Sequence, residues 1–128
     1  MGAHYWEAMT LDPPKSFETK LWLLQRASAI VLGACSIIHL GVIIEAVKAG
    51  LTAAEIINRV GGSTGWFIFY SIFVFAASVH APIGLRTIIK ESITASNLSI
   101  TIAVSSFSLV LMGLGMWSIV GFYQLEQF

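Results

Sequence analysis

Residues 92–125 read SITASNLSITIAVSSFSLVLMGLGMWSIVGFYQL, which is thirty-four positions without a charged side chain. Two other uncharged stretches, 27–44 and 60–85, have eighteen and twenty-six positions. A transmembrane helix needs about 20 predominantly apolar residues, so each stretch supports one crossing of a bilayer. Only helices and closed barrels satisfy backbone polar groups in lipid, and no stretch shows the period-two alternation of a barrel strand. The sequence therefore predicts an all-α membrane protein with three transmembrane helices, near residues 22–47, 66–90 and 98–123.

The composition excludes a soluble catalytic domain. Of the 128 residues, 56% are hydrophobic and 11% are charged, whereas a soluble domain has about 25% charged residues. We therefore predict one membrane domain, residues 1–128. The formal net charge is +0, so the sequence lacks the excess of positive charge that is typical of proteins that bind nucleic acid. The single cysteine, Cys35, excludes an internal disulfide or a thiolate cluster and is expected to be a buried thiol. Residues 1–20 lack the short apolar core of a cleavable signal peptide.

Two short interfacial helices are predicted outside the crossings. Thr52 and Glu55 have the spacing of a capping box in the first connection, residues 49–65. Three apolar residues then fall on one side and two glycines end the segment: Ile56, Ile57, Val60, Gly61 and Gly62. This pattern is typical of a helix that lies on the membrane surface. The N-terminal stretch up to Phe17 is predicted to form a similar helix on the other side.

Lysines and arginines near the helix ends indicate the orientation. With three crossings, the N-terminus and the second connection lie on the same side of the membrane. Five basic residues lie on that side and two on the other: Lys15, Lys20, Arg26, Arg86 and Lys90, against Lys48 and Arg59. This excess predicts that the N-terminus faces the cytoplasm, or the matrix if the protein is mitochondrial.

Ionisable side chains inside a membrane are costly and are functional candidates by default. His80 lies in the second predicted helix, with Gly84 four positions later on the same helical face. The missing Cβ of Gly84 lets a flat ring approach, and Pro82, which cannot donate a hydrogen bond to the Ser78 carbonyl, is expected to add a local bend. Two interpretations follow: His80 is the axial ligand of a haem, or it is hydrogen-bonded across a helix interface.

His39 lies in the first predicted helix, about 25 Å from its inner end, while His80 is about 15 Å from the same side. At heights about 10 Å apart, the two imidazoles are not expected to ligate one iron. His39 therefore either serves a second haem or packs against a neighbouring helix.

Arg26 lies at the inner end of the first predicted helix, with Ser28 two positions on. The arginine either reaches the lipid headgroups or donates hydrogen bonds to a carbonyl oxygen or a haem propionate. The same two interpretations apply to Arg86 and Lys90.

Two motifs resemble those of a known family. The run Gln25-Arg26-Ala27-Ser28 contains Arg-x-Ser at the start of the first helix. The run His80-Ala81-Pro82-Ile83-Gly84-Leu85-Arg86 contains His-x-x-x-Gly-x-Arg, and an acidic residue, Glu91, follows eleven positions after the histidine. Both motifs, the length and the three-helix layout are similar to the cytochrome b membrane anchor subunits of succinate dehydrogenase and fumarate reductase (respiratory complex II).

This resemblance implies a role for each matching residue. His80 is the expected axial ligand of haem b, beside Gly84 and Arg86, and His39 the expected ligand of a second haem. These two histidines are the expected metal ligands. The residues expected at the quinone site are Trp22, Arg26, Ser28 and Glu91. Trp22 replaces a quinone-contacting serine of the large anchor type, and Ser92 replaces a tyrosine of the small type, so the sequence leaves the type of anchor open.

The function implied by the resemblance is that of a non-catalytic subunit of a succinate:quinone oxidoreductase, which links the tricarboxylic acid cycle to respiratory electron transport. Its expected partners are a flavoprotein subunit, an iron–sulfur subunit, a second membrane anchor that shares the haem, and the lipid of a bacterial, archaeal or mitochondrial inner membrane. Two alternatives are a haem-free membrane scaffold or transporter subunit, and the haem anchor of another quinone-linked dehydrogenase.

Overall fold

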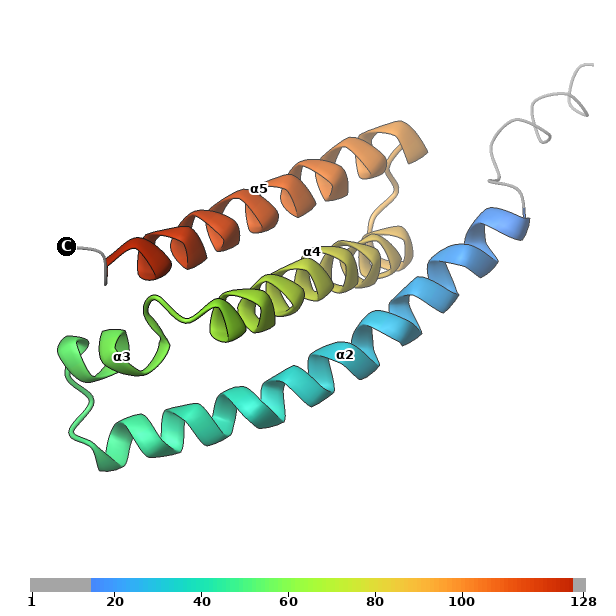
Figure 1. Ribbon diagram of the computed structural model, residues 1–128. Coiled ribbons are helices and arrows are strands. Elements are labelled where there is room, and N and C mark those ends of the chain that lie inside the picture. The colour runs from blue at the N-terminus through green and yellow to red at the C-terminus, as the bar shows by residue number, and fades with distance from the viewer. Residues whose placement is uncertain (1–14, 126–128) are drawn as a thin grey trace, which may run out of the picture.

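The computed structural model describes residues 15–125 and shows four helices in this part of the chain (Figure 1). They are α2 (Lys15–Lys48), α3 (Ala53–Val60), α4 (Thr64–Ser92) and α5 (Asn97–Gln124). Three of them, α2, α4 and α5, are long and apolar enough to cross a membrane. The all-α class and the three predicted crossings are therefore confirmed.

The long helices lie in a row with α4 in the middle (Figure 1). Helix α4 packs against both α2 and α5. The short helix α3 joins the far end of α2 to the start of α4 and also contacts α5. Because α4 has a neighbour on each side, it carries most of the interhelical contacts.

The first helix is longer than the apolar stretch that predicted it. Helix α2 begins at Lys15, seven positions before the expected start at residue 22. Phe17, which was expected in a separate interfacial helix, therefore belongs to the first turn of α2. The remainder of that expected helix, residues 1–14, lies outside the described residues. Hydropathy marks only the part of a helix that contacts lipid, and it does not register a polar extension beyond the membrane.

The interfacial helix between α2 and α4 has the predicted boundaries. The Thr52 hydroxyl caps α3 by accepting a hydrogen bond from the backbone N–H of Glu55. The Glu55 carboxylate forms an ion pair with Arg59 one turn later. The helix stops at Gly61, and Gly62 has a positive φ of 61° that favours glycine. The chain then turns directly into α4, which Ser63 caps.

Helix α4 continues through Pro82 without a break. Proline has no N–H, so the carbonyl of Ser78 loses its partner within the helix. The hydroxyl of Ser108 on α5 donates a 2.6 Å hydrogen bond to that carbonyl. In a membrane, a neighbouring helix commonly satisfies a backbone group that proline frees.

Helices α4 and α5 are in tight contact at Gly115. A Cβ added at Gly115 would lie 2.5 Å from a methyl group of Val74, whereas one added at Gly113 would meet nothing within 4 Å. We expect Gly115→Ala to lower the free energy of unfolding in detergent by about 1–3 kcal/mol, because the added methyl overpacks the interface. Thermal unfolding followed by circular dichroism measures the effect. Gly113→Ala is the matched control, and equal stability of the two variants would contradict this account.

Candidate functional site

The His80 imidazole lies between α4 and α2. Its Nδ1 is 3.3 Å from the backbone carbonyl oxygen of Gln25 and 3.3 Å from the hydroxyl oxygen of Ser28. The Ser28 hydroxyl donates its own proton to the Leu24 carbonyl at 2.7 Å, so its oxygen is left to accept. Both neighbours of Nδ1 are therefore acceptors, which places the ring proton on Nδ1.

This tautomer leaves a lone pair on Nε2 of His80. No described residue forms a hydrogen bond with that nitrogen. A metal-ligating histidine almost always donates its other ring N–H to a carbonyl, a carboxylate or water, which fixes the tautomer and the ring orientation. The His80 ring is therefore prepared to ligate a metal through Nε2.

The space beside Gly84 is taken by the side chain of Gln25. A Cβ added at Gly84 would lie 3.2 Å from Nε2 of that amide, so the glycine lets α2 place the glutamine against α4. The Oε1 atom of Gln25 is buried and has no hydrogen-bond partner among the described residues. A buried amide oxygen without a partner is costly, so this position suits a ligand that donates a hydrogen bond.

Arg86 and Lys90 both contact the Glu18 carboxylate, at the end of the row of helices where α2 begins and α4 ends. Arg86 donates two hydrogen bonds to Glu18, of 3.0 and 3.3 Å, and Lys90 lies 3.5 Å from the same carboxylate. The Arg86 side chain is only 13% exposed, and its guanidinium lies 5.7 Å from the ring centre of Phe17. We call this group of Glu18, Arg86 and Lys90 the inner cluster, because its end of the row is predicted to face the cytoplasm or the matrix. It fixes α2 against α4 and shows that its two cations can hold a carboxylate.

A cavity of about 440 Å³ adjoins this cluster and opens between α2 and α4. Trp22 and Arg86, two of the residues singled out by the resemblance, line it together with Gln25 and Glu18. The helical spacing of Gln25, three positions before Ser28, places both on the face that meets His80. That spacing is the signal that would have identified Gln25 from the sequence.

Other predicted quinone residues do not line this cavity. Ser28 is buried against His80, whereas Arg26 is exposed and stacks over the Trp22 ring at 5.0 Å. Residues two positions apart on a helix point in nearly opposite directions, so Arg26 and Ser28 do not face one site. Glu91 lines a separate cavity of about 410 Å³ beside the connection from α4 to α5.

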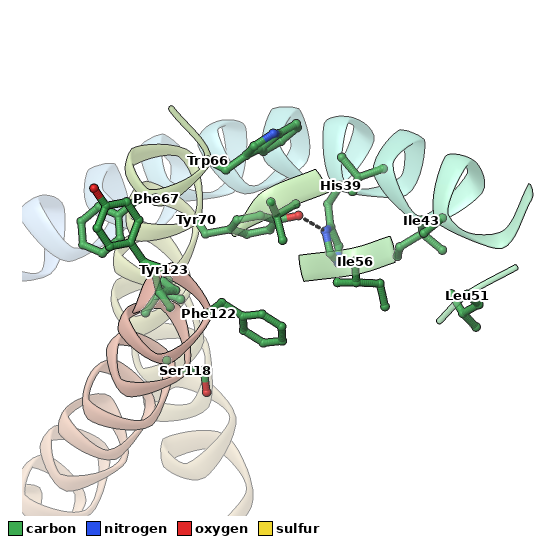
Figure 2. Close-up of a pocket in the computed structure, with 16 residues that line it drawn as sticks. His39, Ile43, Leu51, Ile56, Trp66, Phe67, Tyr70, Ser118, Phe122 and Tyr123 are labelled. Carbon is green, nitrogen blue, oxygen red and sulfur yellow. Dashed lines mark hydrogen bonds between the residues drawn. The ribbon is translucent and has the colours of Figure 1, made fainter. Parts of the chain in front are cut away.

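His39 lies at the other end of the row, in a second pocket (Figure 2). Its Nδ1 is 3.2 Å from the hydroxyl of Tyr70, and the rings of Tyr70 and Phe73 contact it edge-on. The pocket has a volume of about 390 Å³ and an almost wholly apolar lining, to which α2, α3, α4 and α5 all contribute. Counting about ten residues along α4 from Tyr70 to His80 places the two imidazoles about 15 Å apart in height. This agrees with the expectation that they do not share one iron.

Among residues 15–125, no three His, Cys, Asp or Glu side chains come together as a metal site. What the chain offers in this part is two separate imidazoles, those of His39 and His80.

The sequence profile of the succinate dehydrogenase/fumarate reductase transmembrane subunit family matches residues 11–115. The chain belongs to this family. The match covers both motif runs and all of α2, α3 and α4, together with most of α5. No curated protein and no solved structure was found to match the chain.

Membership in the succinate dehydrogenase/fumarate reductase transmembrane subunit family makes the chain a multi-pass membrane anchor that works in a complex with the other subunits of the enzyme. The family therefore decides against a transporter subunit and against the anchor of an unrelated dehydrogenase.

Proposed function

We propose that this anchor binds haem b through His80 and forms a quinone site at the inner end of α2 and α4. The observation that carries the proposal is the His80 ring, whose Nδ1 meets two acceptors on α2 while its Nε2 has no partner among the described residues. An imidazole oriented in this way inside a membrane helix is suited to a metal.

The residues around His80 fit a haem in charge and donor chemistry, although the Gln25 side chain fills the space beside Gly84 that the ring was expected to use. Nε2 of His80 would hold the haem iron, while Gln25 and Ser28 hold the ring through Nδ1. Arg86 already holds a carboxylate, which is the chemistry that a propionate requires, but in this proposal its guanidinium is assigned to the quinone. Haem b, when bound, accepts and returns one electron. Because residues 15–125 offer one imidazole at this height, a further histidine ligand would come from a second membrane anchor.

The cavity between α2 and α4 is the proposed quinone site. Trp22 provides an aromatic surface for the quinone ring, and the Gln25 amide and the Arg86 guanidinium provide hydrogen bonds to its carbonyl oxygens. The reduction of quinone to quinol takes up two electrons and two protons, and the electrons come from the iron–sulfur subunit. The unpartnered Oε1 of Gln25 accepts a hydrogen bond from the quinol hydroxyl.

The other residues that the resemblance singled out have different roles in this proposal. Ser28 acts through the His80 ring, while Arg26 and Glu91 lie at the inner surface, where the soluble subunits dock. His39 is the proposed ligand of a second, outer haem. The hydroxyl of Tyr70 both donates and accepts hydrogen bonds, so it does not fix the tautomer of His39. His80 therefore carries the haem proposal.

The inner cluster also supports the proposed orientation. Glu18, Arg86 and Lys90 meet directly, so the start of α2 and the end of α4 lie on the same side. That side carries the excess of basic residues and is assigned to the cytoplasm or the matrix. The flavoprotein and iron–sulfur subunits dock there.

Purification of the tagged complex in mild detergent tests the proposed function. We expect a flavoprotein and an iron–sulfur protein to co-purify, and the reduced-minus-oxidised spectrum to show a b-type haem. A colourless membrane domain with both soluble subunits bound would favour a haem-free anchor. That second candidate has support in the structure, because both imidazoles already bridge α2 and α4 through Nδ1.

A further inference from the structure

The hydrogen bond between the Ser108 hydroxyl and the backbone of α4 lies close in sequence to His80, the proposed haem ligand. It lies on the opposite face of α4. Ser78, whose carbonyl accepts the Ser108 hydrogen bond, and His80 are two positions apart on α4 and so point in nearly opposite directions. Ser78 therefore faces α5 while His80 faces α2, in agreement with the row of helices (Figure 1).

The carbonyl of Ser78 has no alternative partner in the described part of the chain. Pro82 removes the N–H that would bond it within the helix. Ser78 is 1% exposed, so water does not reach the carbonyl freely. If the Ser108 hydroxyl is removed, α4 has to bend or shift so that this carbonyl finds another donor, because an unsatisfied buried carbonyl is costly.

The contacts that orient His80 are sensitive to such a shift. Its two Nδ1 contacts, to Gln25 and Ser28, are both 3.3 Å long. Both are long, weak hydrogen bonds at the far end of the usual nitrogen–oxygen range, so a small movement of α4 weakens both of them.

We propose that Ser108 is a positioning residue for His80: by bonding the carbonyl that Pro82 frees, it sets the conformation of α4 at the imidazole. The third membrane helix, which supplies no ligand to the proposed haem and quinone sites, thereby controls the orientation of the ligand. This inference rests on the proposed haem site.

The test compares Ser108→Ala with wild type in the purified complex. We expect the midpoint potential of the haem to shift and its low-spin electron paramagnetic resonance signal to change shape, because both report the orientation of the axial imidazole. Haem loss in detergent should become about threefold faster, which is the usual size for one interhelical hydrogen bond in a membrane protein. Ser106→Ala, at an exposed position of the same helix, is the matched control and should behave as wild type.

Two further variants separate positioning from general damage to the fold. Ser108→Thr keeps the hydroxyl, and a cavity of about 250 Å³ lined by both Ser78 and Ser108 leaves room for its methyl group, so it should restore the wild-type signal. Pro82→Ala returns an N–H to α4. Adding Ser108→Ala to Pro82→Ala should therefore change the haem signal no further.

The outcomes separate this inference from the proposed function. A complex without haem, or one whose haem persists in His80→Ala, overturns the proposed haem site and with it the role of Ser108. If His80→Ala loses the haem but Ser108→Ala keeps the wild-type potential and signal, only the positioning role is overturned. An undiminished effect of Ser108→Ala in the Pro82→Ala background likewise overturns it.

Discussion

His80→Ala is expected to remove the b-type absorbance from the purified complex while the soluble subunits stay bound. The variant loses the one imidazole that residues 15–125 place at the proposed haem site, and alanine supplies no ligand in its place. The measurement is the reduced-minus-oxidised spectrum, normalised to the flavin content of the same preparation. Normalisation to flavin keeps the comparison of variant and wild type valid if the yield of the complex falls.

Ser28→Ala is the graded control for this result. It removes one of the two acceptors at Nδ1 and leaves the Gln25 carbonyl. Removing an outer-shell partner typically costs 10–100-fold in affinity, so we expect weaker haem retention without complete loss. A full b-type spectrum in His80→Ala would show that the imidazole serves only to bridge α2 and α4.

The second large effect is expected at Arg86. Arg86→Met removes a guanidinium that lines the proposed quinone cavity and lies only 13% exposed. Hydrogen bonds from charged groups contribute about 1.5–3 kcal/mol, so succinate:quinone turnover should fall about tenfold or more. Electron transfer from succinate to a soluble artificial acceptor bypasses the membrane domain and should change little.

Lys90→Met is the matched control for Arg86→Met. Lys90 contacts the same carboxylate, that of Glu18, at 3.5 Å, but it does not line the cavity. If both variants lose quinone turnover equally, the inner cluster acts by holding the helices together, and the assignment of Arg86 to the quinone site is wrong.

The crossings were predictable because the bilayer imposes one strong requirement on sequence. Uncharged stretches of sufficient length have to be helical in lipid, whatever their detailed packing. The start of α2 at Lys15 was not predictable in this way, because its first turns are polar and lie outside the range that hydropathy tests. The cap at Thr52 was predictable, since it depends on residues only three positions apart.

The site was predictable only where a motif lies within one helix. His80 and Gly84 share a helical face, and that spacing is visible in the sequence. The pairing of Arg86 with Glu18 joins positions 68 apart, and no local pattern indicates it. Pro82 shows that a carbonyl is freed, but it does not show which hydroxyl of α5 bonds it.

Helix α2 contains 34 residues, which makes it about 51 Å long, well beyond the hydrocarbon thickness of about 30 Å. Its first turns are therefore expected to project from the membrane. They belong to the same helix as Gln25 and Ser28. One unbroken helix therefore carries both this projecting end and the two groups that contact His80, the Gln25 carbonyl and the Ser28 hydroxyl.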